Sequence, residues 1–283
     1  MVSSAQGRSA QPPFRRRQLG RTLRRLRERV GMTQHEAATR LEFSLSKVSR
    51  IESGQRPGLH EFRAMLDIYG LPSGDWEPYL DEYRRAKENG WWRAYGLSDQ
   101  GYVSMEDEAS RVREFQNGFI PGLLQTEAYA EAIFAASGML RSRHTIENQI
   151  AVRMRRQDRL TTQPALRLDT IIDETVLRQR VPPQVMRAQL ALIVERSNLP
   201  NVRVRVLPRD IEPHDGQYGA FILLDFPEPA DPEIAYVEHA FGSVHIEEAE
   251  DVRAARLRFD QLAERALGET DSLRLLDRLA SRT

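Results

Sequence analysis

The sequence contains no cysteine, which excludes disulfide bonds and thiolate metal ligands. It also lacks any run of 18 apolar residues, the length that a membrane-spanning helix needs. The first residues, MVSSAQGRSAQPPF, hold no apolar stretch of the kind found in signal peptides. Together these absences predict a soluble, cytoplasmic protein that has no membrane partner.

Lysine is nearly absent as well, since only Lys47 and Lys87 stand beside 39 arginines. Such a bias is typical of a GC-rich genome, so an arginine cluster by itself indicates little. The distribution of charge indicates more: residues 1–60 carry 13 basic and 4 acidic side chains, whereas the rest of the chain carries 28 and 37. A basic segment attached to an acidic body is the pattern of a nucleic-acid-binding domain joined to a second domain.

Apolar periodicity predicts an all-helical module that follows a polar tail over residues 1–14. Thr33 and Glu36 have the spacing of a capping box, Ser44 is a good N-cap, and Gly54 is a good helix stop. The expected helices cover residues 15–30, 33–41, 44–53 and 58–69.

The short turn between the second and third helices predicts a helix-turn-helix, whose second helix lies in the major groove of double-stranded DNA. That helix, within SLSKVSRIESG, places Val48 and Ile51 on the module's own core. Arginine and lysine match guanine, and serine serves several bases. The candidates for base contacts are therefore Ser46, Lys47 and Arg50. Gln34 and Ser44 stand at helix starts, where phosphate contacts form. Arg56, which follows the third helix, is a further candidate for DNA contact.

The stretch GMTQHEAATRLEFSLSKVSRIESG resembles the core of XRE-family regulators, the group that includes phage repressors. The family pattern is G-x-(S/T)-Q-x-x-(L/A)-A, followed by a helix that begins with serine and ends in I-E-x-G. This resemblance implies phosphate contacts from Gln34 and Ser44, and a base-facing set of Leu45, Ser46, Lys47 and Arg50. It also implies a buried ion pair between Arg27 and Glu52.

A charged helix over residues 75–89 leads to NGWWRAYG. Trp91 and Trp92 most simply fill the junction between two domains, and the alternative is a surface on which a ligand or a base stacks. Further helices are expected at 126–138 and 145–163. The second of these carries an arginine-rich face that is either solvated or docks an acidic partner or ligand: Arg153, Arg155, Arg156 and Arg159.

The last part of the chain changes character, because β-branched residues alternate or cluster between prolines and glycines. The expected strands lie in ALRLDTII, VRVRVLP, YGAFILLDF, EIAYVE and SVHIE, and helices are expected at 184–197, 248–266 and 270–280. We therefore expect an α+β protein: a helix-turn-helix domain at 15–72, a connecting helix and junction at 73–99, and an α+β domain at 100–283 with a mostly antiparallel sheet.

This second part also resembles a known group, through motifs such as IPGLLQTEAYA, IIDETVLR, NVRVRVLP and YVEHAFG. From about Leu19 to Leu275 the chain is similar to actinobacterial XRE regulators whose C-terminal domain has no known function. Members are often encoded beside a small acidic protein, and some carry a toxin–antitoxin label. The resemblance implies transcription control by a DNA-binding protein whose body senses a partner protein or a ligand.

Catalytic motifs are incomplete. HEAAT begins like the zinc motif H-E-x-x-H, but Thr39 replaces the second histidine. A Ser–Lys dyad needs a lysine in the C-terminal domain, and both lysines precede it. His239 and His245 flank the expected hairpin turn AFGSV, where His245 faces Glu238 in one register. A metal site formed with His214 is the less favoured alternative.

These patterns predict a homodimeric, antitoxin-like transcription regulator that binds double-stranded DNA and a small acidic partner protein, without a cofactor, a metal or an enzymatic activity. A regulator that responds to a small-molecule effector is the alternative, and an enzyme tethered to DNA is a third hypothesis.

Overall fold

The computed structural model describes residues 12–98, 101–136, 142–228 and 231–282. The chain divides into two compact units, Met1–Ser104 and Met105–Thr283. Most of the expected polar tail lies outside the described residues, as do the expected domain boundary at 99–100 and the expected helix end at Gly138.

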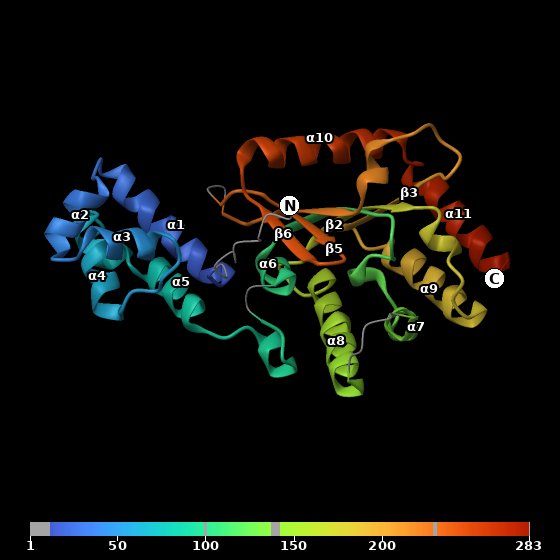
Figure 1. Cartoon of the computed structure of the whole chain (residues 1–283), viewed down its shortest axis with the longest axis horizontal. Helices are drawn as coiled ribbons and strands as arrows, with labels where there is room; N and C mark the ends of the chain where they lie inside the picture. Colours follow the sequence, from blue (N-terminus) through green and yellow to red (C-terminus); the bar gives the residue numbers. More distant parts are fainter. Residues whose placement is uncertain (1–11, 99–100, 137–141, 229–230, 283) are drawn as a thin grey trace, which may run out of the picture. The chain divides into compact units, whose positions relative to one another are not determined.

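Unit 1 is helical, as the periodicity predicts (Figure 1). Its helices are α1 (Phe14–Arg29), α2 (Gln34–Leu41), α3 (Leu45–Glu52), α4 (Leu59–Ile68) and α5 (Glu77–Lys87). Their apolar stripes meet in one core that includes Leu19, Leu23, Val48, Ile51, Phe62, Met65 and Tyr69. Short helices are marginal on their own in water, so this shared core holds the module together.

The predicted helix ends of unit 1 are confirmed. Thr33 caps α2, and the side chain of Glu36 accepts from the Thr33 backbone N–H at 2.7 Å, which completes the capping box. The Oγ of Ser44 accepts from the backbone N–H of Lys47 at 3.2 Å and caps α3. Between the two helices the chain turns through Glu42, a non-glycine residue at φ 55°.

Gly20 allows α1 to approach α3 closely. A Cβ at this position would lie 2.6 Å from the backbone oxygen of Glu52 and 2.7 Å from that of Ile51. Because both neighbours are backbone atoms, they have no side-chain freedom with which to make room. The absent side chain therefore brings the first helix onto the end of the third.

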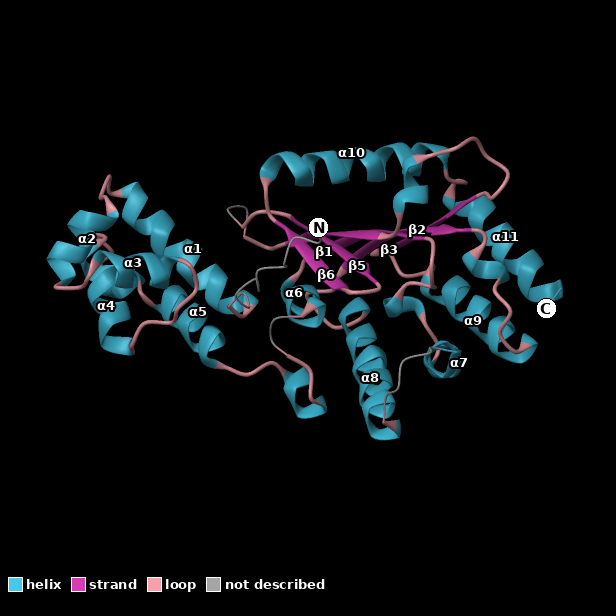
Figure 2. Ribbon diagram, viewed as in Figure 1, coloured by secondary structure: helices cyan, strands magenta, loops and turns pink. Residues whose placement is uncertain are grey.

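Unit 2 confirms the α+β class and is built on a six-stranded sheet (Figure 2). Its strands are β1 (Arg111–Gln116), β2 (Arg167–Asp173), β3 (Val202–Leu207), β4 (Phe221–Asp225), β5 (Ile234–His239) and β6 (Gly242–Ile246). Its helices are α7 (Glu127–Ala136), α8 (Arg143–Arg156), α9 (Pro183–Arg196), α10 (Ala249–Arg265) and α11 (Glu269–Arg282), while α6 (Tyr102–Glu108) crosses the boundary between the units.

The sheet is mixed, with the strand order β3-β2-β1-β4-β5-β6. The pairs β3–β2 and β2–β1 are parallel, and the three remaining pairs are antiparallel. Three of the five strand pairs are antiparallel, as expected, and the half of the sheet formed by β1, β2 and β3 is parallel. That half arises because helices lie between β1, β2 and β3 along the chain, and parallel neighbours need such crossovers.

Strand β1 does not follow a simple apolar pattern, and the sequence analysis did not predict it. It pairs with β2 on one side and β4 on the other, at the centre of the sheet. Two of its charged residues are buried, Arg113 at 7% and Glu114 at 3% exposure. Arg113 pairs with Glu233 and with Asp225 at 3.3 Å, so charge compensation replaces apolar character on this strand.

Helix α10 covers one face of the sheet, and α8 and α9 lie on the other side (Figure 2). The core under α10 includes Phe115, Ile171, Leu223, Ala235, Phe259 and Leu262. The expected hairpin at the end of the sheet is present as β5–β6, but the register that sets His245 against Glu238 is wrong. Tyr236 lies opposite His245, and Ser243 lies opposite Glu238.

Candidate nucleic-acid interface

Helix α3 has one buried side and one exposed side. Val48 and Ile51 are buried in the module core, at 0% and 1% exposure. Ser46 and Arg50 are exposed, and Leu45 keeps 49% of its surface open to solvent. An apolar residue left open beside serine and arginine suits contact with thymine methyl groups and guanine edges.

Lys47 is more constrained than its neighbours on α3. Its ammonium group forms an ion pair with Glu61 and lies 3.9 Å from the centre of the Phe43 ring. Glu61 also accepts from the backbone N–H of Gly58 at 2.9 Å, at the start of α4. The hydrogen bond from Lys47 is the main cause that lowers the pKa of Glu61. Lys47 must therefore leave Glu61 before it contacts a base.

The residues that are predicted to contact phosphate lie at the starts of α2 and α3. Ser44 is exposed, and its Oγ lies 3.1 Å from the Oγ of Ser46. Gln34 is half-buried, and its side-chain Nε2 donates to Glu52 Oε2 at 2.7 Å. The amide of Gln34 is thus fixed by the module itself, beside an α2 N-terminus whose first N–H groups suit an anion.

The predicted ion pair between Arg27 and Glu52 is present and bidentate. Arg27 Nε donates to Glu52 Oε1 at 2.6 Å and Nη2 donates to Oε2 at 2.9 Å, while Nη1 donates to the Met32 carbonyl at 2.6 Å. The side chains are 7% and 3% exposed. The hydrogen bond to Glu52 raises the pKa of Arg27, and burial raises the pKa of the neighbouring Tyr69.

Arg56 has a partner inside the unit. Its Nη1 donates to the Tyr83 hydroxyl at 2.9 Å, and its guanidinium lies 5.4 Å from the centre of the Tyr83 ring. The sequence offered no signal for this contact, because Tyr83 stands 27 residues away on α5. A DNA contact from Arg56 stays a prediction, and one of its guanidinium nitrogens already donates to Tyr83.

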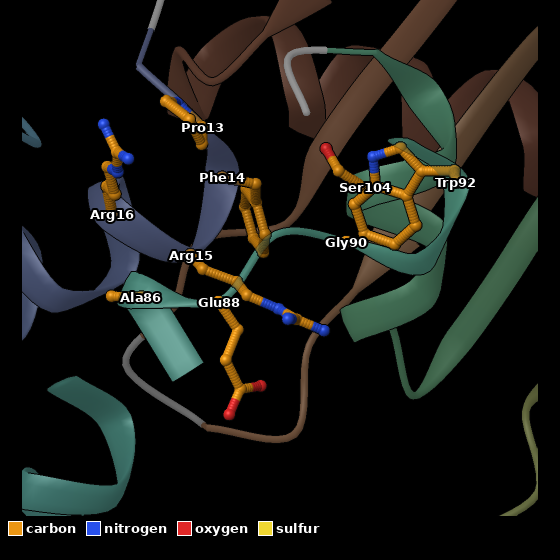
Figure 3. Close-up of a pocket in the computed structure, with 9 residues that line it drawn as sticks. All are labelled: Pro13, Phe14, Arg15, Arg16, Ala86, Glu88, Gly90, Trp92 and Ser104. Carbon is orange, nitrogen blue, oxygen red and sulfur yellow. The ribbon is translucent and has the colours of Figure 1, made fainter. Parts of the chain in front are cut away.

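A small pocket lies where the start of α1, the end of α5 and the turn at Trp91–Tyr95 come together (Figure 3). Trp92 lines it at 2% exposure, and its indole Nε1 has no hydrogen-bond partner among the described residues. Gly90 is required here, since a Cβ would lie 2.0 Å from the Trp92 ring. Arg15, Arg16, Glu88 and Ser104 supply the polar lining. Trp91 is half-buried and packs edge-on against Trp92.

The arginines of α8 and of the 3-10 turn that follows it, Gln157–Leu160, do not form the expected exposed face. Arg156 makes two hydrogen bonds to the buried carboxylate of Glu106, at 2.6 and 2.7 Å. Arg153 donates to Gln125 Oε1 at 2.7 Å, and burial lowers its pKa to about 10. Arg159 donates to two backbone carbonyls, at 3.0 and 2.8 Å. Only Arg155 of the four is exposed, so the prediction of a four-arginine docking face is wrong.

Glu114 is a buried acid that the sequence analysis missed. Gln116 Nε2 donates to it at 2.8 Å, and in the register of β1 and β2 it lies opposite Thr170, whose hydroxyl has no hydrogen-bond partner among the described residues. Burial raises the pKa of Glu114 to about 7. The carboxyl is therefore partly protonated near neutral pH, inside the central strand.

Two family models match the chain. One, described as a domain of unknown function (DUF5753), matches residues 100–278. The chain belongs to the DUF5753 family. A second model, described as a helix-turn-helix domain, matches residues 18–76 of this DUF5753 protein, and it makes the chain a DNA-binding regulator. No curated protein and no solved structure matches the chain.

In this DUF5753 protein the match to the helix-turn-helix model runs from within α1 through α4 and so includes the exposed side of α3. No helix in the described part of the chain has the length and apolar character to cross a membrane. The described residues also contain no group of three His, Cys, Asp or Glu side chains placed to hold a metal ion.

Proposed function

We propose that the protein is a cytoplasmic, sequence-specific transcription regulator of the XRE type, which binds double-stranded DNA as a homodimer through α3. The observation that carries the proposal is the two-sided character of α3. Leu45, Ser46 and Arg50 are open to solvent, while the opposite side of the helix is fixed in the core. The motifs shared with actinobacterial XRE regulators support the same assignment.

The test is selection of an operator from a random pool, followed by binding measurements at fixed salt. We expect Arg50→Ala to weaken specific binding by about 1–3 kcal/mol and to relax preference at one base pair. Gln34→Ala should weaken all sequences more evenly, because phosphate contacts carry no sequence information. The control is Arg63→Ala, an exposed residue on α4. Equal operator affinity of Arg50→Ala and the native chain contradicts the proposal.

For unit 2 we propose an antitoxin-like role, the binding of a small acidic partner protein that is encoded nearby. Arg153, Arg156 and Arg159 are engaged internally, so we place the docking surface elsewhere. Phe119 and Tyr218 are 52% and 86% exposed. Their loops are joined by a hydrogen bond from Asn117 Nδ2 to the Gly216 carbonyl at 3.0 Å. Exposed aromatic side chains on a fixed loop pair are typical anchors of a protein interface.

Co-purification of the chain with the product of the adjacent small gene tests this role. The double variant Phe119→Ser and Tyr218→Ser should lose most of the partner. Leu257→Ser is the matched control, because Leu257 is 59% exposed on α10. A change in operator affinity when the partner binds supports regulation. A partner can change DNA affinity only if it binds the free and the DNA-bound forms of the protein with different affinities. Unchanged operator affinity at saturating partner contradicts it.

A small-molecule effector is the second candidate, and the pocket at Trp92 favours it. An indole N–H that is buried without an acceptor is costly, and a ligand carbonyl or carboxylate would satisfy it. Because Trp92 lines the pocket, its fluorescence should change when metabolite fractions are added, and Trp92→Phe should abolish that change. We infer no enzymatic activity and no cofactor, since unit 2 contains neither lysine nor cysteine and the motifs of nucleophilic catalysis are incomplete.

A further inference from the structure

Unit 1 treats the two basic side chains of α3 differently. Arg50 is exposed, and its guanidinium makes no ion pair or hydrogen bond with the residues that the structure describes. Lys47 is half-buried, and its ammonium group forms an ion pair with Glu61 of α4. Residues three apart on a helix are neighbours on its surface, so both cations start from the same side of α3. Arg50 therefore reaches the DNA interface with its full charge, whereas the charge of Lys47 is already compensated.

Lys47 is held by neighbours from two different segments. Its Nζ donates to Glu61 Oε1 and lies 3.9 Å from the centre of the ring of Phe43, which belongs to the turn between α2 and α3. Phe43 packs against the core of unit 1, so its ring is fixed. A cation within about 6 Å of an aromatic ring is attracted to it. The fold thus positions the ammonium group, although a lysine side chain in solution is flexible.

Glu61 is itself fixed at the start of α4. Its second oxygen, Oε2, accepts from the backbone N–H of Gly58 at 2.9 Å, in the capping box of that helix. One carboxylate oxygen therefore serves α4 and the other serves Lys47. The side chains of Lys47 and Glu61 are 29% and 34% exposed, so their attraction is partly shielded from water and salt.

A contact from Lys47 to DNA would leave Glu61 without its cation. In the proposed complex α3 lies in the major groove, whose two sides are phosphate backbones. A carboxylate that loses its cation there is repelled by the phosphates, while the freed ammonium group is attracted to them. The attraction gained is offset by this repulsion, which favours the arrangement already present on the protein.

We propose that Glu61 is a positioning residue that withholds Lys47 from DNA. It keeps the lysine cation on the surface of unit 1, so that α3 reads bases through Arg50 and its other exposed residues, and the phosphate backbone meets one cation fewer. This inference rests on the proposed function, because it requires α3 to lie in the major groove. It replaces the sequence-based expectation that Lys47 contacts a base.

The variant Glu61→Gln releases Lys47. A glutamine keeps an oxygen that accepts from the Gly58 N–H, so the cap of α4 survives while the charge is lost. The double variant Lys47→Gln and Glu61→Gln removes both charges of the pair, so its net charge equals that of the native chain. Asp67→Asn is the charge-matched control, because Asp67 is exposed on the same helix. The full-length chains are titrated with a selected operator and with a duplex of unrelated sequence.

Salt dependence measures the released cation. One additional lysine–phosphate contact steepens the dependence of log affinity on log salt by about 0.9. Between about 50 and about 200 mM salt, Glu61→Gln should therefore lose about 3.5-fold more affinity than either the native chain or the double variant, on both duplexes. Asp67→Asn should keep the native slope. Equal slopes of Glu61→Gln and the double variant overturn the proposal.

The double variant also decides whether Lys47 reads a base in the native complex. We expect it to keep the operator affinity, the base preference and the salt slope of the native chain. A lysine that contacts guanine would cost about fivefold or more in operator affinity when it is removed, and that result overturns the proposal.

A measurement without DNA tests the ion pair itself. Lys47 and Lys87 are the only lysines of the chain, and Lys87 is exposed on α5. An amine-reactive ester should label Lys47 more slowly than Lys87 in the native chain, and Glu61→Gln should bring the two rates together. Equal rates in the native chain overturn the proposal. A native chain that selects no operator refutes the proposed function, whereas equal salt slopes of the native and Glu61→Gln chains on a selected operator refute this inference alone.

Discussion

Helices α3 and α8 both carry basic side chains, but the two units use them in opposite ways. On α3, Arg50 is exposed and the apolar residues are buried. On α8, Arg153 and Arg156 reach inward, and Arg156 neutralises the buried Glu106. A basic side chain on a helix thus indicates a nucleic-acid or acidic partner only where it is exposed, as Arg50 is, and not where a carboxylate of its own unit compensates it, as Glu61 does for Lys47.

The largest expected effect concerns the ion pair that supports α3. Glu52→Ala leaves Arg27 buried without its carboxylate, and we expect it to destabilise unit 1 by about 3–5 kcal/mol. Hydrogen exchange of α1 and α3 peptides in the full chain measures this loss. Glu36→Ala, at an exposed cap, is the control and should increase exchange much less, because Glu36 is exposed. Unchanged exchange in Glu52→Ala would mean that the pair contributes nothing.

Unit 2 contains a comparable buried ion pair, formed by Glu106 and Arg156. Glu106→Ala strands Arg156, whose side chain is 13% exposed compared with 7% for Arg27. Because water reaches Arg156 more easily, we expect a smaller loss, about 3 kcal/mol or less. The readout is exchange at α8 and β1. A larger loss of stability in Glu106→Ala than in Glu52→Ala would contradict this expected order.

Glu114 makes the stability of unit 2 depend on pH. Its folded pKa of about 7 exceeds the ordinary value of 4.5, so the native state holds the proton more tightly than the unfolded state. The stabilisation is complete below pH 4.5 and is lost as pH rises through 7, for a total of about 3 kcal/mol. Glu114→Gln removes this dependence. Urea unfolding at about pH 5 and about pH 8 measures it, and equal pH slopes for both chains contradict it.

The smallest effects on stability are expected for the exposed arginines of the two helices. Arg155→Ala on α8 and Arg50→Ala on α3 should each change stability by no more than about 0.5 kcal/mol. Only Arg50→Ala should also weaken operator binding. Thermal melts and binding curves recorded in the same buffer separate the two effects. A clear loss of operator affinity in Arg155→Ala would contradict the expectation that, of these two helices, only α3 contributes to operator binding.

The N-terminal fold could be predicted because its determinants are local. The capping box at Thr33 and Glu36, the cap at Ser44 and the apolar spacing lie within a few residues of the structure that they specify. The contact that orients α1 on α3 is different, since it depends on Gly20 meeting the backbone of Ile51 and Glu52, far along the chain. A glycine inside a helical pattern is a weak signal, and it does not identify the neighbour.

Unit 2 was less predictable because its polar residues are compensated at long range. Arg113 and Glu114 argue locally against a buried strand, and the carboxylates that make the burial of Arg113 acceptable, Asp225 and Glu233, lie 112 and 120 residues away. The exposure of the α8 arginines was predicted wrongly for the same reason. Helical spacing shows which residues share a face, but not whether Glu106 lies within reach of that face. The buried and exposed sides of α3 were predicted, while the contact of Lys47 with Glu61 was not.

The position of β1 has a consequence for synthesis on the ribosome. Its two neighbours in the sheet come late, β2 at residue 167 and β4 at residue 221, so its pairing must wait for most of the chain. Unit 1 has all of its core helices by residue 87, and its contacts are local, which favours early and rapid folding. A nascent or prematurely terminated chain would thus acquire a folded helix-turn-helix before the unit proposed to control it.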